Sequence, residues 1–273
     1  EYYSEVGALY LFEENSQGIW EQKAISVPKN VICLGGYGRS MSGAEDLSSF
    51  VGAYYNKIGK GLPTIIGQVF VTQKTDSGYN QRPQITPPPE INNVNTQRFG
   101  ASLSFHQTSE LYITTLAKNT DSTQTPDKGG VYEYQPNSEQ EYEFKATITV
   151  DEASQYQQFG IKATFLGDKY AAIYAEKTGE NTIFMIKREQ GAGTPWPTTP
   201  FQKITYTDSS VSDLYFCSPN FEEDDIYLAV IISADPNSYI NIYLKKKGEG
   251  QFSLFQTIND PRIVDPESTL PYD

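Results

Sequence analysis

The sequence predicts an all-β fold, a β-propeller of about five four-stranded repeats of roughly 55 residues each. Three observations support this prediction. Tyr and Phe are abundant, with 20 and 14 copies among 273 residues, and aromatic residues favour strands. Apolar and polar residues alternate in short runs that end at turn residues, as in half-buried strands. The same order of runs recurs along the chain.

One repeat is clearest between residues 99 and 150. The runs 99–105, 111–116, 130–134 and 142–150 predict four strands, because polar turns or loops separate them. The chain opens with only the last two strands of such a unit, at residues 7–12 and 20–27. A large β-sandwich is the alternative fold, but the fixed order of the motifs favours a propeller.

Two landmark residues, one aromatic and one isoleucine, recur at similar intervals through the whole chain. The aromatic residue of the predicted third strand lies at Tyr10, Phe70, Tyr132, Phe184 and Tyr243. The closing isoleucine of the fourth strand lies at Ile25, Ile85, Ile148, Ile204 and Ile258. These positions divide the single propeller domain into units 1–28, 29–88, 89–150, 151–207 and 208–260, followed by a tail, 261–273.

The first unit has two strands instead of four, so its edge and one apolar face need a partner. We expect the C-terminal tail to complete this blade within the chain. The alternatives are an upstream segment or a strand from another subunit.

Several short motifs resemble the FG-GAP repeat of integrin-α-like propellers. Phe99-Gly100 and Phe159-Gly160 match its opening, and Tyr37-Gly38 is a variant of it. Gly130-Val131-Tyr132 matches its third strand, whereas Tyr215-Phe216 stands where we expect Phe-Gly in the last repeat. The resemblance implies a propeller for adhesion or recognition outside the cell. The calcium-binding Asp-rich loop of that family is missing, so no metal site is expected.

Composition excludes some classes of function. The formal net charge of −13 disfavours nucleic acid as a partner. No apolar run is long enough to span a membrane as a helix. Cys33 and Cys217 fit either one disulfide or two buried thiols.

Few residues are suited to catalysis. His106 is the only histidine and falls in a predicted turn, so no His-based triad can be assembled. The densest acidic run, Glu222–Asp225, reads as a hairpin tip. We therefore predict that the chain is not an enzyme and binds no cofactor.

The predicted function is that of an extracellular, non-catalytic module for recognition, adhesion or structure. Its partner would be a protein or glycan ligand, or copies of the chain itself, and its location secreted or at the cell surface. Tyr54, Tyr55, Arg98 and Tyr156 are the predicted binding residues, because they fall near the loops of one propeller face. Two alternatives remain open: a self-assembling filament or surface-layer subunit, and a secreted glycan-acting enzyme.

Three segments are rich in Pro and Thr, and no Asn lies in an N-glycosylation motif. We therefore predict that any glycan is O-linked. The candidate acceptors are Thr86, Thr120, Ser122, Thr123, Thr125, Thr194, Thr198 and Thr199.

Overall fold

The computed structural model is built almost entirely of β-strands. It describes residues 8–27, 40–43, 49–55, 65–76, 78–88, 96–105, 110–117, 129–139, 141–189, 193–207, 209–218, 225–233 and 238–259. Within these ranges the one helical element is a 3-10 turn, η1 (Ala153–Gln155). The strands are β1 (Leu9–Glu14), β2 (Trp20–Ser26), β3 (Ser40–Gly43), β4 (Ser49–Tyr55), β5 (Ile65–Thr75), β6 (Gly78–Ile85), β7 (Thr96–Phe105), β8 (Leu111–Ala117), β9 (Gly130–Pro136), β10 (Tyr142–Ile148), β11 (Gln158–Leu166), β12 (Tyr170–Lys177), β13 (Glu180–Lys187), β14 (Gln202–Tyr206), β15 (Ser210–Cys217), β16 (Ile226–Ser233), β17 (Tyr239–Lys245) and β18 (Ser253–Asn259).

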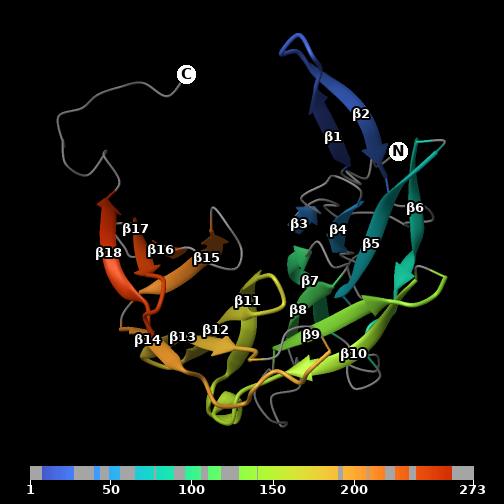
Figure 1. The fold of residues 1–273 in the computed structure, drawn as a ribbon. Helices are drawn as coiled ribbons and strands as arrows, with labels where there is room; N and C mark the ends of the chain where they lie inside the picture. Colours follow the sequence, from blue (N-terminus) through green and yellow to red (C-terminus); the bar gives the residue numbers. More distant parts are fainter. Residues whose placement is uncertain are drawn as a thin grey trace, which may run out of the picture.

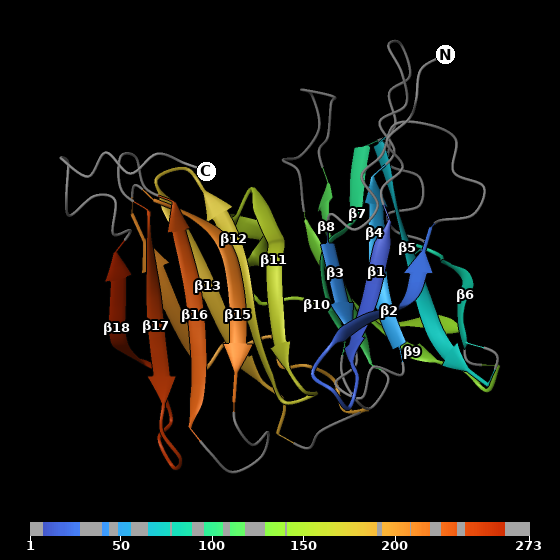
Figure 2. The same cartoon turned by 90° about the horizontal axis from the view of Figure 1, so that it is seen from above.

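These strands form one hairpin and four antiparallel sheets of four strands each, in chain order, of which the first two are joined into one eight-stranded sheet. We name the sheets blade I (β3–β6), blade II (β7–β10), blade III (β11–β14) and blade IV (β15–β18), and the hairpin is β1–β2. A short parallel pairing, Ile65 with Thr96 and Ile66 with Gln97, joins blades I and II. The blades stand side by side along an arc, with β3, β7, β11 and β15 on its inner side (Figure 1). Figure 2 shows the same blades from above. The predicted all-β propeller is confirmed.

The repeat landmarks fall where the sequence predicts them. The five aromatic residues lie on β1, β5, β9, β13 and β17, and the five isoleucines lie on β2, β6, β10, β14 and β18. In the middle of the arc they are buried, as at Phe184 (0% exposed) and Ile148 (1%). At the two ends they are exposed, as at Tyr10 (58%) and Ile258 (43%). Their burial thus depends on having a blade on both sides. The tail, 261–273, lies outside the described residues.

The hydrophobic core consists of layers between neighbouring blades. One cluster lies between blades I and II and contains Val69 and Ile113. A second joins blades II and III around Phe165 and Phe184, and a third joins blades III and IV around Leu228. Burying one such side chain stabilises the fold by about 1.5–3 kcal/mol, so each blade depends on its neighbour.

Glycines allow neighbouring blades to approach closely. Gly67 on β5 and Gly129 just before β9 lie three residues before Phe70 and Tyr132, respectively. A Cβ atom at Gly67 would overlap the carbonyl oxygen of Phe99 on the next blade, and one at Gly129 would overlap that of Phe159. These overlaps explain glycine at this position of the repeat.

The inner strands share an irregularity near the Phe-Gly motif. Pairing shifts register after Phe99 in β7 and after Phe159 in β11, and the following glycines, Gly100 and Gly160, have positive φ. In β15 the shift follows Val211, which is 6% exposed. Val211, rather than Tyr215-Phe216 as predicted, therefore takes the place of the phenylalanine. A smaller apolar side chain fills the corresponding buried position.

Two further sequence features can be placed. Cys217 is free and exposed on β15, so it is not a buried thiol, whereas Cys33 and His106 lie outside the described residues. Of the acidic run, only Asp225 is described, and its carboxylate accepts the backbone N–H of Lys247. Among the residues with described positions, no helix is long and apolar enough to cross a membrane.

Candidate functional site

The inner strands of neighbouring blades are linked by short polar side chains. The Ser42 hydroxyl accepts the Phe105 N–H at 2.9 Å, and the Ser102 hydroxyl donates to the Ala163 carbonyl at 3.1 Å. The Thr164 hydroxyl accepts the Phe216 N–H at 3.4 Å. This repeated linkage fixes the spacing of β3, β7, β11 and β15, and with it the positions of other side chains on these strands.

One group of titratable side chains lies on β11 and β15, next to this linkage. The Tyr215 hydroxyl donates to Oδ2 of Asp213 at 2.8 Å, and Lys162 Nζ lies 3.8 Å from the same oxygen. Oδ1 of Asp213 accepts the Leu214 N–H at 3.0 Å. Both carboxylate oxygens of Asp213 therefore have an interaction partner. We call Lys162, Asp213 and Tyr215 the inner-strand triad.

The triad is open to solvent. The side chains of Lys162 and Asp213 are 30% and 33% exposed, and Tyr215 is 53% exposed. The hydrogen bond to Asp213 raises the pKa of the Tyr215 phenol, with smaller contributions from burial and from the carboxylate charge. Tyr215 thus keeps its proton at neutral pH and donates it in the hydrogen bond to Asp213.

This geometry is that of a nucleophile, a base and an orienting group. A phenol within hydrogen-bond reach of a carboxylate can lose its proton to that carboxylate as its oxygen attacks an electrophile. The ammonium group of Lys162 holds the carboxylate from the other side. The triad can therefore support nucleophilic or acid–base chemistry on a molecule that reaches the inner side of blades III and IV.

A second charged cluster is buried between blades II and III. Arg188 Nη2 lies 2.7 Å from Glu133 Oε2, and Arg188 Nη1 lies 3.8 Å from Glu110 Oε1. The Tyr112 hydroxyl donates to Glu110 at 2.7 Å, and the Arg188 guanidinium lies 4.4 Å from the centre of the Trp196 ring. Burial raises the pKa values of Glu133 and Tyr112.

This cluster has no access to solvent. Arg188 is 1% exposed, Glu110 2% and Glu133 3%. Because no substrate can reach these groups, we assign the cluster to the joint between the two blades. Its Arg188 Nε and Nη1 and Trp196 Nε1 have no hydrogen-bond partner among the described protein atoms.

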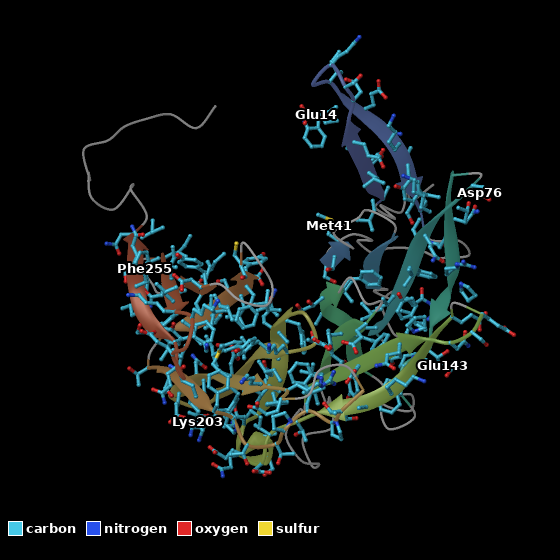
Figure 3. All side chains as sticks on the ribbon, in the orientation of Figure 1. Glu14, Met41, Asp76, Glu143, Lys203 and Phe255 are labelled. Carbon is cyan, nitrogen blue, oxygen red and sulfur yellow. The ribbon has the colours of Figure 1, made fainter. Side chains whose placement is uncertain are left out.

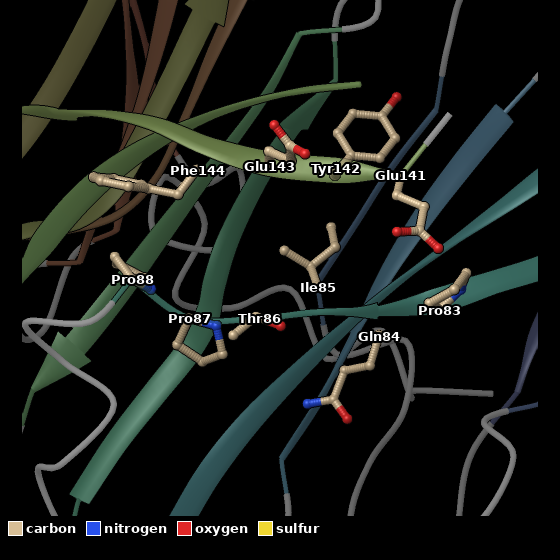
Figure 4. A pocket seen from close by; sticks show the side chains of 10 residues that line it. All are labelled: Pro83, Gln84, Ile85, Thr86, Pro87, Pro88, Glu141, Tyr142, Glu143 and Phe144. Atoms are coloured by element: carbon tan, nitrogen blue, oxygen red, sulfur yellow. The ribbon is translucent and has the colours of Figure 1, made fainter. Parts of the chain in front are cut away.

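A groove of about 590 Å³ runs along the outer rim between β6 and β10 (Figure 4). Its exposed carboxylates are those of Glu141 and Glu143. Asn137 donates to Glu143 at 2.9 Å and lowers its pKa, and Lys145 lies 3.5 Å from it. Glu143 is thus held as an ionised carboxylate and is a poor proton donor. The groove is lined by Pro83, Gln84, Ile85, Thr86, Pro87, Pro88, Glu141, Tyr142, Glu143 and Phe144.

The predicted binding residues do not form a site in the described part of the chain. Tyr156 is 3% exposed, since its ring packs edge-on against Phe184 at 5.1 Å and its hydroxyl donates to Glu180 and Thr182. The prediction of an exposed Tyr156 is wrong, because the loop that carries it folds back onto blade III. Tyr54 and Tyr55 lie on β4 and Arg98 lies on β7, but their side chains are outside the described set.

Some of the predicted glycan acceptors lie among the described residues and others lie outside them. Thr198 and Thr199 are exposed, and Thr199 donates its hydroxyl to Asp151 at 3.0 Å. Thr86 lines the rim groove, and Thr194 is half-buried. Thr120, Ser122, Thr123 and Thr125 lie outside the described residues.

Sequence reasoning missed the inner-strand triad. Lys162 and Asp213 are far apart in the chain and meet because β11 and β15 are neighbours. A usable signal was the pair Asp213 and Tyr215, which alternation places on the same side of one inner strand. For the buried cluster, the signal was Glu133 within the apolar run of the third strand.

No family model and no curated protein matches the sequence. Among solved structures, fructan 1-exohydrolase IIa from Cichorium intybus is similar at 12% identity over 79% of this chain, with a TM-score of 0.44. A glucose dehydrogenase is similar at 12% identity over 93% of the chain, with a TM-score of 0.47. The hemagglutinin-neuraminidase ectodomain of parainfluenza virus 5 is similar at 8% identity over 82% of the chain, with a TM-score of 0.32. The chain covers 43%, 80% and 82% of these three proteins, respectively.

The prediction of a non-catalytic module is corrected by this comparison. The three proteins just described are all named as enzymes. We therefore drop the predicted recognition, adhesion or structural role and the prediction that the chain is not an enzyme. The sequence argument failed because it required a histidine or a repeated acidic motif. Acid–base groups that meet only between blades have no such motif. The resemblance to FG-GAP repeats remains a prediction.

Proposed function

We propose that the chain is a glycan-acting enzyme whose reactive group is Tyr215, with Asp213 as its base. The observation that carries the proposal is the 2.8 Å hydrogen bond from the exposed phenol to a carboxylate that Lys162 and the Leu214 N–H hold in place. Tyrosine is a known type of nucleophile in glycoside hydrolysis.

The reaction follows from the positions of these three groups. The Tyr215 oxygen attacks the anomeric carbon of a sugar while its proton passes to Asp213. The glycosidic C–O bond breaks, and the leaving oxygen takes a proton from the Lys162 ammonium. Water then attacks the same carbon and gives its proton to Lys162, and Asp213 returns its proton to the departing Tyr215 oxygen.

A polyhydroxylated, uncharged substrate suits this environment. Hydroxyl groups can hydrogen-bond to a carboxylate and an ammonium group, and the exposed Tyr215 ring offers an apolar face beside them. The net charge of −13 disfavours polyanionic substrates.

A secreted or cell-surface location and O-linked sugar on exposed threonines such as Thr198 belong to the same proposal. Intact-mass measurement of the native protein before and after β-elimination tests the O-linked modification.

Activity measurements on two single-site variants test the proposed roles. We expect the purified protein to release sugar from members of a panel of aryl glycosides and oligosaccharides. Tyr215→Phe and Asp213→Asn each remove one reactive group and should lower kcat/KM by about a thousandfold.

Two matched control variants show whether the same substitutions lower activity when they lie outside the inner-strand triad. Tyr10→Phe and Asp168→Asn alter an exposed phenol and a turn carboxylate outside the triad, and both should keep full activity. Retained activity in Tyr215→Phe, or wild-type protein that turns over no member of the panel, would reject the proposal.

A further inference from the structure

Both ends of the arc carry apolar sheet faces that no other described blade covers. At one end, Tyr10, Phe12, Trp20 and Ile25 of the β1–β2 hairpin are 58%, 46%, 66% and 52% exposed. Strand pairing places Tyr10 opposite Ile25 and Glu14 opposite Trp20, so these side chains share one face. We call it the hairpin face.

At the other end, blade IV presents a second apolar face. Ile231 on β16 pairs with Ile240 on β17, which pairs with Ile258 on β18, and this gives one row of isoleucines across three strands. Ile242 extends the row along β17, and Phe255 on β18 is 59% exposed. We call this set the blade IV face. Figure 3 labels Glu14 and Phe255, which mark the two ends.

The blade IV face resembles a buried face in its composition. The other side of β16 carries Leu228, Val230 and Ile232, which are fully buried against blade III. A strand that is apolar on both sides is typical of a sheet covered on both sides. A second sheet surface therefore suits this face.

The hairpin already shows how it packs on a blade. Its covered side lies against the outer strands of blade I, where the Ser26 and Thr72 hydroxyls are 2.8 Å apart and the Tyr79 hydroxyl donates to Glu13. A two-stranded hairpin thus packs on the two outer strands of a neighbouring blade. Its open side can do the same on β17 and β18 of another blade.

Charge favours this contact. Glu14 lies on the hairpin face beside the turn of the hairpin, and Lys246 and Lys247 lie in the turn after β17. β1 and β17 occupy the same place in their repeats. If the hairpin packs in the direction in which successive blades pack, the acidic turn meets the basic turn.

We infer that the hairpin face of one copy docks on the outer strands of the blade IV face of a second copy. The contact joins unlike surfaces, so each copy keeps one free face and the assembly can grow. The inner strand β15, with Tyr215, stays uncovered because the hairpin has only two strands. The C-terminal residues 260–273 are a poorer occupant, since Ile263, Val264 and Leu270 are their only aliphatic side chains larger than alanine.

Sedimentation velocity over a wide range of protein concentration tests the inference. We expect the mass of the wild-type chain to rise with concentration, and high salt to weaken the association. Trp20→Glu blocks the hairpin face and Ile258→Glu blocks the blade IV face, so each variant alone should stay monomeric. An equimolar mixture of the two should form a dimer that does not grow, because each variant keeps one intact face.

Met41→Glu changes an exposed apolar residue on β3, outside both faces, and should assemble like the wild type. A wild-type chain that is monomeric at every concentration, or variants that do not pair when mixed, would overturn the inference. Association that occurs only after residues 260–273 are deleted would also overturn the inference, since the tail would then be what covers one of the two faces. Circular dichroism verifies that each variant is folded.

Discussion

Among the residues that the structure describes, Arg188 carries the only positive charge paired with Glu110 and Glu133 in the buried joint between blades II and III. Each of the three side chains is at most 4% exposed. A buried charge is tolerated when it is paired, and removal of one partner leaves the others uncompensated. The joint therefore depends on this one side chain.

We predict that Arg188→Met destabilises the protein by about 3–5 kcal/mol, because two buried carboxylates lose their cation. Urea unfolding followed by circular dichroism measures the loss. The matched control, Lys203→Met, removes an exposed ion pair with Glu152 and should cost less than about 1 kcal/mol. Equal effects of the two changes would contradict a special role for Arg188.

A second prediction concerns pH. Burial raises the pKa of Glu133 above its ordinary value of 4.5, so the folded state holds this proton more tightly than the unfolded state. The stabilisation that comes from this tighter proton binding is therefore present below the ordinary pKa of 4.5. It is lost as pH rises through the raised pKa of the folded state. Glu133→Gln, which cannot ionise, should gain stability relative to the wild type as pH rises through this window. Thermal unfolding across the pH range tests this, and a difference that is independent of pH would contradict it.

At the scale of the element, alternation predicted most strands closely. The runs 111–116 and 130–134 became β8 and β9, each longer by at most two residues at its end. The predicted strand 142–150 corresponds to β10, which ends at Ile148. Alternation marks half-buried strands such as β10, whereas β8 and β9 are buried along most of their length and were predictable as short apolar runs that end at turn or loop residues.

Contacts between elements were harder to predict. The register shifts in β7, β11 and β15 depend on how one blade meets the next, and so does the approach of Lys162 to Asp213. These contacts depend on the angle between blades, which no single repeat encodes. Most of the fold was therefore predictable from the sequence, whereas the candidate site was not.

The glycine positions give a prediction about this blade spacing. Gly67→Ala places a methyl group against the Phe99 carbonyl of the next blade, so the two blades must separate locally. We expect a loss of about 1–3 kcal/mol in the free energy of unfolding. Gly250→Ala is the matched control, because no atom lies within 4 Å of its added Cβ. A neutral Gly67→Ala variant in chemical denaturation would contradict the close approach of blades I and II.

At the scale of the whole molecule, the proposed function depends on the arrangement of the blades. The hydroxyl linkages between the inner strands hold β11 and β15 in register, and this register brings Lys162 to Asp213. The outer strands carry the apolar faces at the two ends of the arc. The proposed reaction uses β11 and β15, whereas the proposed association uses β1, β2, β17 and β18, so each can be altered without the other.

The most direct test of the central claim is to trap the sugar on the protein. The chain is incubated with fluorinated glycosides that carry good leaving groups, and the adduct is located by peptide mass spectrometry. The account predicts one covalent sugar on Tyr215, slower labelling in Asp213→Asn and no labelling in Tyr215→Phe. Turnover of the parent glycosides without any adduct on Tyr215, or with an adduct on another residue, would contradict it.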